Sequence, residues 1–382
     1  MIYLDSGATT LEKPPEVARA MARAVGTMSS PGRGNYPASR RAEQTAFACR
    51  EAAARLFQVP TPDQVVFTSN ATHGLNIAIR SLARPGGRVA ISGYEHNAVT
   101  RVLHSIPGVE MIVADAPLFA PEKILDGFHR ALRRGVDAVV CNHVSNVFGC
   151  VQPVEAIAQL CRQYNTPLIV DASQSAGILP VTLSDWGAAF VAMPGHKGLY
   201  GPQGMGLLLC GGEASPLLCG GTGSASRMQT MPPDLPDRLE AGTHNMPGIA
   251  GLLEGLRFVA RMGTENIADH EIRLTRRAAR GLAALPGVEV FADRKGQSQT
   301  GVLSFRVRGM DSEQIGEELA RRQIAVRSGL HCAPLAHRTA GTLETGTVRL
   351  SPSIFNTPRH IDTFLRELTA ILRENESSGS RS

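Results

Sequence analysis

The 382-residue sequence contains no apolar run long enough to cross a membrane as a helix, so we expect no membrane partner. Its first residues include no basic stretch followed by an apolar core, so we expect no secretory signal peptide. The seven cysteines are odd in number and are not clustered. This usage is typical of a reducing compartment rather than of a disulfide framework, and it predicts a cytoplasmic location.

Concentrated basic charge is also missing. The formal net charge of +5 is small for this length, and the basic residues occur singly or in short pairs such as Arg40-Arg41. A nucleic-acid-binding protein commonly gathers these residues on one face, so we expect no nucleic-acid partner. Hydrophobic residues make up 43% of the chain and charged residues 19%, which is typical of a globular protein with a large buried core.

Short β-branched runs alternate with segments of helical periodicity between residues 64 and 210. Several runs are apolar almost throughout, as strands covered on both faces must be. The alternation predicts an α/β fold whose mostly parallel seven-stranded sheet is covered by helices. The link between the last two runs, 189–193 and 205–210, is short and glycine-rich, which predicts that these two strands are antiparallel neighbours. The expected strands are 64–68, 88–92, 110–115, 138–144, 167–172, 189–193 and 205–210.

The pattern changes in the second half of the chain. Residues 211–248 have the Gly, Pro and Ser content of a loop, and a long amphipathic stretch follows. Strand-like runs at 288–291, 302–308 and 348–351 then accompany helical segments at 312–322 and from 358, which predicts a smaller α+β domain. We therefore expect a large domain over 1–250 that includes an N-terminal arm, a small domain over 251–375, and a disordered tail over 376–382.

Polar side chains follow five of the predicted strands. The residues are Thr72, His96, Asn146, Asp171 and Lys197, and in open α/β sheets ligands bind at the carboxyl ends of strands. Taken alone, Lys197 could be a surface lysine in a turn, and the start of the helix at Thr72 could be an ordinary N-cap. Polar residues at five strand ends instead predict one ligand site, with a phosphate held at the helix start.

The motifs resemble those of class V, fold-type I enzymes that use pyridoxal phosphate (PLP), and among them the cysteine desulfurases and selenocysteine lyases. The similarity runs from residue 4 to about residue 370, and the motifs together are far more specific than any one alone. The matching stretches are Leu4-Asp5-Ser6-Gly7-Ala8-Thr9-Thr10, Ala71-Thr72, Glu95-His96, His143-Val144-Ser145-Asn146-Val147-Phe148-Gly149, Val170-Asp171-Ala172-Ser173-Gln174, Gly195-His196-Lys197, Tyr200-Gly201-Pro202, Glu240-Ala241-Gly242-Thr243, Arg327-Ser328-Gly329-Leu330-His331-Cys332-Ala333, Arg349-Leu350-Ser351 and Phe355-Asn356-Thr357.

The resemblance implies a role for each matching residue. Lys197 would hold the cofactor covalently and move protons, Asp171 would keep the pyridinium nitrogen protonated, and His96 would stack on the ring. The expected catalytic residues are Lys197, His96 and Cys332. Arg349 would bind the substrate carboxylate. The remaining contacts would be Gln174 and Asn146 at the phenolic edge of the ring, Asn146 also at the substrate, Ala71, Thr72 and His196 at the phosphate, and Thr243 reaching that phosphate from the other subunit of a homodimer.

Cys332 separates the subfamilies. Its loop resembles that of the second desulfurase group, in which a thiolate attacks the sulfur of PLP-bound L-cysteine to give alanine and an enzyme persulfide for an acceptor protein or thiol. A nearby cation would stabilise the thiolate, and Arg327, His331 and His337 are close in sequence. The alternatives are a buried structural cysteine or a zinc site, but the further ligands that zinc requires are missing, so we expect no metal.

Two positions depart from the family pattern. Pro194 stands where relatives have a Ser or Thr that binds the phosphate, and proline offers neither a hydroxyl nor an N–H group. Tyr36 closes the glycine-rich segment 32–36 and stands where many relatives have histidine. We expect a weaker phosphate grip, or another group that compensates, and altered contacts on the substrate side.

The leading hypothesis is therefore a PLP-dependent cysteine desulfurase. A selenocysteine lyase acting on L-selenocysteine is the nearest alternative, because it shares the scaffold and needs Cys332 little. Another class V reaction, such as transamination or a different C–S cleavage, would make Cys332 incidental. A non-enzymatic sulfur carrier is a further possibility, against which the complete set of Lys197, Asp171 and His96 argues.

Overall fold

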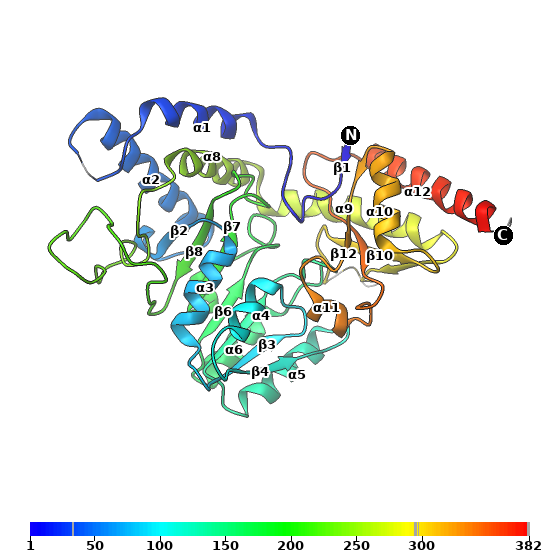
Figure 1. Ribbon diagram of the computed structural model, residues 1–382, viewed down its shortest axis with the longest axis horizontal. Helices are drawn as coiled ribbons and strands as arrows, with labels where there is room; N and C mark the ends of the chain where they lie inside the picture. Colours follow the sequence, from blue (N-terminus) through cyan, green and yellow to red (C-terminus); the bar gives the residue numbers. More distant parts are fainter. Residues whose placement is uncertain (33, 294–295, 297, 380–382) are drawn as a thin grey trace.

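The computed structural model describes residues 1–32, 34–293, 296 and 298–379. Residue 33 of the glycine-rich segment 32–36 and residues 380–382 of the predicted tail lie outside this set. Figure 1 shows a large sheet with helices on both sides and a smaller unit beside it. The N-terminal arm starts at the smaller unit and crosses to helix α1 (Pro15–Thr27) at the far side of the large one.

The large sheet contains all seven predicted strands, in the order β2-β8-β7-β6-β5-β3-β4. All neighbours pair in parallel except β8, which is antiparallel to both β7 and β2, so the α/β prediction and the predicted reversal are confirmed. The strands are β2 (Val65–Thr68), β3 (Arg88–Ser92), β4 (Glu110–Ala114), β5 (Ala138–Asn142), β6 (Leu168–Asp171), β7 (Phe190–Pro194) and β8 (Gly206–Cys210).

Successive side chains of each strand enter two separate hydrophobic cores, one on each face of the sheet. In β6, Leu168 and Val170 join one core and Ile169 joins the other. Helices α3 (Ala71–Leu82) and α4 (Asn97–His104) cover the face of Ile169, and α2 (Pro37–Leu56), α5 (Pro121–Leu132), α6 (Val154–Gln163), α7 (Leu183–Trp186) and α8 (Met246–Met262) cover the other. Within the described ranges, no helix has the length and apolar content needed to cross a membrane.

The smaller unit is a four-stranded antiparallel sheet, in the order β12-β13-β10-β9, packed against helices. The N-terminal β1 (Ile2–Tyr3) pairs in parallel with β11 (Ile324–Ala325) at its side. This arrangement confirms the predicted α+β character. Its other elements are α9 (Thr264–Ala283), β9 (Val288–Phe291), β10 (Leu303–Val307), α10 (Ser312–Arg321), β12 (Arg327–Gly329), α11 (Pro334–Thr339), β13 (Thr347–Leu350) and α12 (Pro358–Gly379).

Apolar packing divides the chain differently from the predicted boundary at residue 250. Leu252 and Leu256 of α8 belong to a core of the large sheet, whereas Leu4 of the N-terminal arm belongs to the core of the smaller unit. The two units therefore separate between α8 and α9, at Gly263. The first residues of the arm pack with the smaller unit because β1 adds to β11.

Helix α12 continues to Gly379 and so extends into the range 376–382 for which a disordered tail is predicted. After Pro358, no proline or glycine interrupts the helix before its last residue. Arg322, which directly follows α10, also forms an ion pair with Glu374 near the end of α12 (Nη2–Oε2 2.6 Å). This ion pair holds the last part of α12 against the rest of the smaller unit.

Candidate active site

Four neighbouring strands of the large sheet carry the central residues of the site. His96, Asn146, Asp171 and Lys197 lie at or just beyond the carboxyl ends of β3, β5, β6 and β7, which are adjacent in that order. The fifth predicted strand end, after β2, leads into α3. The parallel pairing brings these residues to one edge of the sheet, where α/β proteins bind ligands.

A cavity at this edge gathers most of the predicted site. Thr243, Cys332 and Arg349 are not part of its lining. The other eight predicted residues do line it: Ala71, Thr72, His96, Asn146, Asp171, Gln174, His196 and Lys197.

Lys197 lies in the turn after β7, which packs tightly on the turn after β6. A Cβ atom on Gly198 would lie 2.4 Å from the carbonyl oxygen of Ala176, so only glycine permits this approach. Burial, together with the nearby charge of Arg349, lowers the pKa of Lys197 to about 8. A substantial fraction of the amine is therefore neutral near pH 7–8, which is the nucleophilic form.

The ring of His96 is fixed by the backbone. Its Nδ1 accepts a hydrogen bond from the amide of Ala98 (3.0 Å), and burial lowers its pKa to about 4, so the imidazole is neutral. The preceding Glu95 is fully buried and accepts hydrogen bonds from Ser92 Oγ (2.6 Å) and from the Asn142 amide (2.8 Å). Glu95 thus anchors the turn that presents His96.

Asp171 and Asn146 present oxygen atoms to the cavity. Asp171 is buried, and its Oδ1 accepts a hydrogen bond from the Ser173 amide (2.9 Å). Asn146 Nδ2 donates to the carbonyl oxygen of His331 (2.8 Å), whereas its buried Oδ1 has no hydrogen-bond partner among the described residues. An unpaired buried acceptor is costly, so this atom favours a ligand that donates a hydrogen bond.

The start of α3 offers an anion site to the same cavity. Asn70 caps the helix by accepting from the His73 amide (2.9 Å), which leaves the earlier amides of the first turn for a ligand. His196 faces this end of the cavity, and its Nδ1 lies 3.0 Å from the hydroxyl of Thr9. Pro194 also lines the cavity and contributes no hydrogen-bond donor.

Arg349 lies behind the cavity and is only 1% exposed. Its Nη2 forms an ion pair with Asp5 Oδ1 (2.7 Å), and its Nη1 donates to the carbonyl oxygen of Asn146 (2.8 Å). Gly7 covers the guanidinium, because a Cβ there would lie 3.2 Å from Cζ. Asp5 lies in one of the motifs that resemble the family, but its contact with Arg349 could not be predicted, because the two residues are joined only through the fold.

Cys332 is exposed and lies in a loop held against the site. Its carbonyl oxygen accepts from the amide of Asn97 (2.8 Å), next to His96. The backbone φ angles of His331 (49°) and Cys332 (57°) are both in the left-handed region, which is strained for residues other than glycine. The loop therefore has a fixed shape that turns the Cys332 side chain outward.

Arg327 is the cation beside the Cys332 sulfur, with Nη2 donating to Sγ at 3.8 Å. The two predicted alternatives have other partners. His331 Nε2 lies 3.1 Å from Thr347 Oγ1 and His337 Nδ1 lies 2.8 Å from Thr342 Oγ1, both buried. Burial lowers the pKa of His337 to about 4, so it adds no positive charge at neutral pH.

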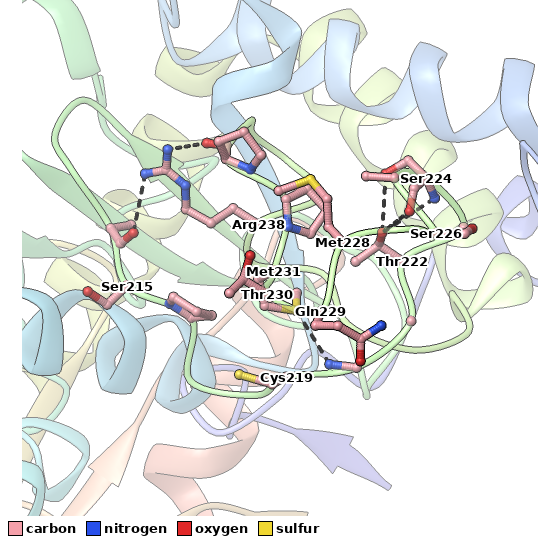
Figure 2. A pocket seen from close by; sticks show the side chains of 18 of the residues that line it. Ser215, Cys219, Thr222, Ser224, Ser226, Met228, Gln229, Thr230, Met231 and Arg238 are labelled. Atoms are coloured by element: carbon pink, nitrogen blue, oxygen red, sulfur yellow. Dashed lines mark hydrogen bonds between the residues drawn. The ribbon is translucent and has the colours of Figure 1, made fainter.

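Thr243 lies outside this cavity, exposed in the long loop between β8 and α8 that projects from the body of the molecule (Figure 1). It lines a separate hollow together with Leu217 and Leu218. Another hollow, of about 1300 Å³, lies within the same loop (Figure 2). Among the described residues, Arg238 is the charged side chain that lines this second hollow; it pairs with Glu213 (2.9 Å), and none of the predicted site residues lies there.

Tyr36, the second departure from the family pattern, is also outside the cavity. It is 50% exposed at the start of α2, and its hydroxyl accepts a hydrogen bond from Ser29 Oγ (3.0 Å). The predicted effect on substrate contacts stays a prediction.

Comparisons with known proteins agree with this arrangement. The family model described as aminotransferase class-V matches residues 2–364. A probable cysteine desulfurase of Methanothermobacter thermautotrophicus is 33% identical, over 94% of this chain and 92% of its own length. One of Mycolicibacterium paratuberculosis is 32% identical over 99% of this chain, which spans only 56% of that longer protein.

A solved structure has the same fold over nearly the whole chain. The apo structure of a cysteine desulfurase from Thermococcus onnurineus NA1 superposes with a TM-score of 0.89 at 28% identity, covering 98% of this chain and 95% of the other. Together with the match of the family model over most of the sequence, this means that the chain belongs to the class V aminotransferase family.

Proposed function

We propose that this protein is a PLP-dependent cysteine desulfurase that removes sulfur from L-cysteine and holds it on Cys332 before transfer to an acceptor. The observation that carries the proposal is an exposed thiol with a guanidinium 3.8 Å from its sulfur, on a loop bonded to the residues flanking the cavity. A structural cysteine would be buried, as five of the other cysteines are. The names of the relatives support the same activity.

The cavity fits PLP in the chemistry of its donors and acceptors. Lys197 would form the covalent link, Asp171 would accept from the pyridinium nitrogen, and the neutral ring of His96 would stack on the cofactor. The first amides of α3 and His196 would hold the phosphate, and Gln174 and Asn146 would contact the phenolic edge. When bound, PLP supplies an electron sink for the amino acid attached to it.

Sulfur transfer would use the exposed side chain of Cys332. Cys332, with the Arg327 guanidinium beside its sulfur, would attack the sulfur of the substrate as a thiolate. The new S–S bond forms on Cys332 as the Cβ–S bond of the substrate breaks. The substrate carbon keeps that electron pair and takes a proton, which gives the methyl group of alanine. A second thiol, on an acceptor protein or a small molecule, then removes the sulfur.

A homodimer would complete the phosphate site. Thr243 is exposed and lies apart from the cavity of its own chain, beside Leu217 and Leu218, which are 37% and 57% exposed. If a second subunit covered these leucines, Thr243 of the first subunit would lie near the phosphate site of the second. We also propose that the protein works in the cytoplasm, as its unclustered cysteines led us to expect.

Pro194→Ser is expected to tighten PLP binding by about 0.5–1.5 kcal/mol, because serine adds one hydroxyl donor at the phosphate end of the cavity. The dissociation constants of PLP for the two proteins, measured by equilibrium titration of the cofactor-free forms, test this expectation. Equal constants would mean that the phosphate is already satisfied by other groups.

Arg349→Lys is expected to raise KM for L-cysteine roughly tenfold to a hundredfold. Lysine keeps the charge that pairs with Asp5, but it lacks the planar guanidinium that reaches Asp5 and the carbonyl oxygen of Asn146 at once, so the group proposed to bind the substrate carboxylate would be displaced. Arg338→Lys, at an exposed position of α11, is the matched control and should leave KM unchanged. An unaltered KM in the Arg349 variant would indicate that another residue binds the carboxylate of L-cysteine.

The direct test of the proposed activity is to incubate the PLP-loaded protein with L-cysteine and a reducing thiol, and to measure alanine and sulfide. Equal amounts of the two products are expected. Pyruvate with sulfide would instead indicate another C–S cleavage, and transfer of the amino group without sulfide would indicate a transaminase. Product from L-selenocysteine but none from L-cysteine would establish the lyase in place of the desulfurase.

A further inference from the structure

The carbonyl oxygen of His196 is surrounded by donors from the N-terminal arm. It accepts from the Thr10 amide (3.1 Å), from Thr10 Oγ1 (2.9 Å) and from Lys13 Nζ (2.9 Å). Thr9 Oγ1 is a fourth donor, at 3.3 Å, and also lies beside the ring of the same histidine. A carbonyl oxygen has two lone pairs, so this crowding marks a peptide that the arm holds in place.

The Lys13 ammonium is an unusual member of this group. It is partly buried, and among the described residues it forms no ion pair; its recorded partners are His196 O and, in a short contact, Thr10 Oγ1. Burial lowers the pKa of Lys13 to about 8, which is the cost of withdrawing a charge from water without a counter-ion. In the described part of the chain, the ammonium therefore depends on its two hydrogen bonds to offset the hydration that it has lost.

The composition of the chain gives a second, independent reason. Four of the 39 basic residues are lysines, so arginine is the default cation of this sequence. Lys13 and Lys197 converge on the same turn, Lys123 is exposed on α5, and Lys295 lies outside the described residues. A compact ammonium with three freely rotating donors suits a confined carbonyl, whereas the planar guanidinium is larger. A lysine at position 13 therefore suits the confined carbonyl of His196 better than an arginine would.

We propose that Lys13 is a positioning residue that fixes the peptide between His196 and Lys197, so that the Lys197 amine points at the aldehyde of PLP and the His196 ring at its phosphate. This inference rests on the proposed binding of PLP at Lys197. The carbonyl that Lys13 holds belongs to the peptide unit immediately before Lys197. Loss of the ammonium would free that unit to rotate and would misdirect both neighbouring side chains.

The sequence offers a specific probe, because histidine is followed by lysine only at positions 196–197. Protein labelled with carbonyl-¹³C histidine and ¹⁵N lysine gives one cross-peak in a carbonyl–nitrogen correlated NMR spectrum. Lys13→Met, which keeps the length but removes the charge, should move this peak upfield in ¹³C, as the carbonyl loses a charge-assisted donor. Lys123→Met is the matched control and should leave the peak in place.

Cofactor binding provides the second readout. In Lys13→Met the dissociation constant of PLP should rise roughly tenfold, the loss expected for one charge-assisted hydrogen bond, and borohydride reduction should attach less cofactor to the Lys197 peptide. Lys13→Arg should be impaired as well, although it keeps the charge. The inference would be overturned if Lys13→Met had the same cross-peak position and the same dissociation constant for PLP as the wild-type protein.

Failure of the inference is distinguishable from failure of the proposed function. If wild-type protein binds no PLP at Lys197, the proposed function fails before any Lys13 variant is compared. If wild type binds PLP and Lys13→Met behaves identically, only the role of Lys13 is wrong. A lower melting temperature of Lys13→Met with an unmoved cross-peak would identify a purely structural lysine and would also contradict the inference.

Discussion

Lys197→Ala is expected to abolish formation of alanine and sulfide while the fold survives. The variant loses the amine that would link PLP covalently and move protons at the bound substrate, and no other described lysine side chain lines the cavity. The side chain makes no hydrogen bond recorded among the described residues, and the tight contact of the turn with Ala176 depends on Gly198 rather than on the lysine. Folding should therefore be unaffected.

Borohydride reduction followed by mass spectrometry checks the loss. Wild-type protein should carry reduced cofactor on the peptide that contains Lys197, and the variant should carry none. Lys123→Ala should behave as wild type, and circular dichroism should be the same for all three. Undiminished turnover in Lys197→Ala would show that the cavity at the sheet edge is not the catalytic centre.

Cys332→Ala is expected to lower the rate of sulfur removal from L-cysteine by on the order of a thousandfold or more, because no thiolate remains to take the sulfur. Binding of PLP and of L-cysteine should persist, since Cys332 does not line the cavity. The side chain is exposed and has the Arg327 guanidinium as its recorded partner, so stability should be retained. The cofactor spectrum should still change when cysteine is added.

The matched control is Cys219→Ala, which removes the other exposed cysteine, in the loop between β8 and α8. Its rate should equal that of wild type. The Cys332 variant should still act on L-selenocysteine, because selenium leaves more readily than sulfur and needs less nucleophilic assistance. Full desulfuration of L-cysteine by Cys332→Ala would make the thiol incidental and would leave a lyase on the same scaffold.

The large sheet and its ligand edge could be predicted from the sequence because both depend on local patterns. Runs such as Val139–Cys141 are apolar on both faces, which only a doubly covered strand permits, and all seven strands are present. The antiparallel β8 followed from the short link after Lys197. Polar residues at strand ends converge because parallel strands share one edge, so the cavity at His96 and Asp171 was predictable in the same way.

Contacts made by the N-terminal arm could not be predicted in this way. The ion pair of Asp5 with Arg349 joins residues 344 positions apart, and the bond from Lys13 to His196 spans 183. Such pairs leave no local pattern, and the arm itself has few of the periodic features that identify a helix or strand. The covered position of Arg349 follows from its pair with Asp5, and the assignment of Leu4 to the smaller unit follows from the pairing of β1 with β11.

The measurement that tests the central claim most directly is the mass of the peptide carrying Cys332 after brief exposure of the PLP-loaded protein to L-cysteine. Alkylation should stop the reaction, and proteolysis should release the peptide for analysis. We predict one additional sulfur atom on Cys332, none on Cys219, and an amount of alanine that matches the trapped sulfur. Formation of several molecules of alanine per enzyme molecule, with no additional sulfur on Cys332, would contradict the proposed mechanism.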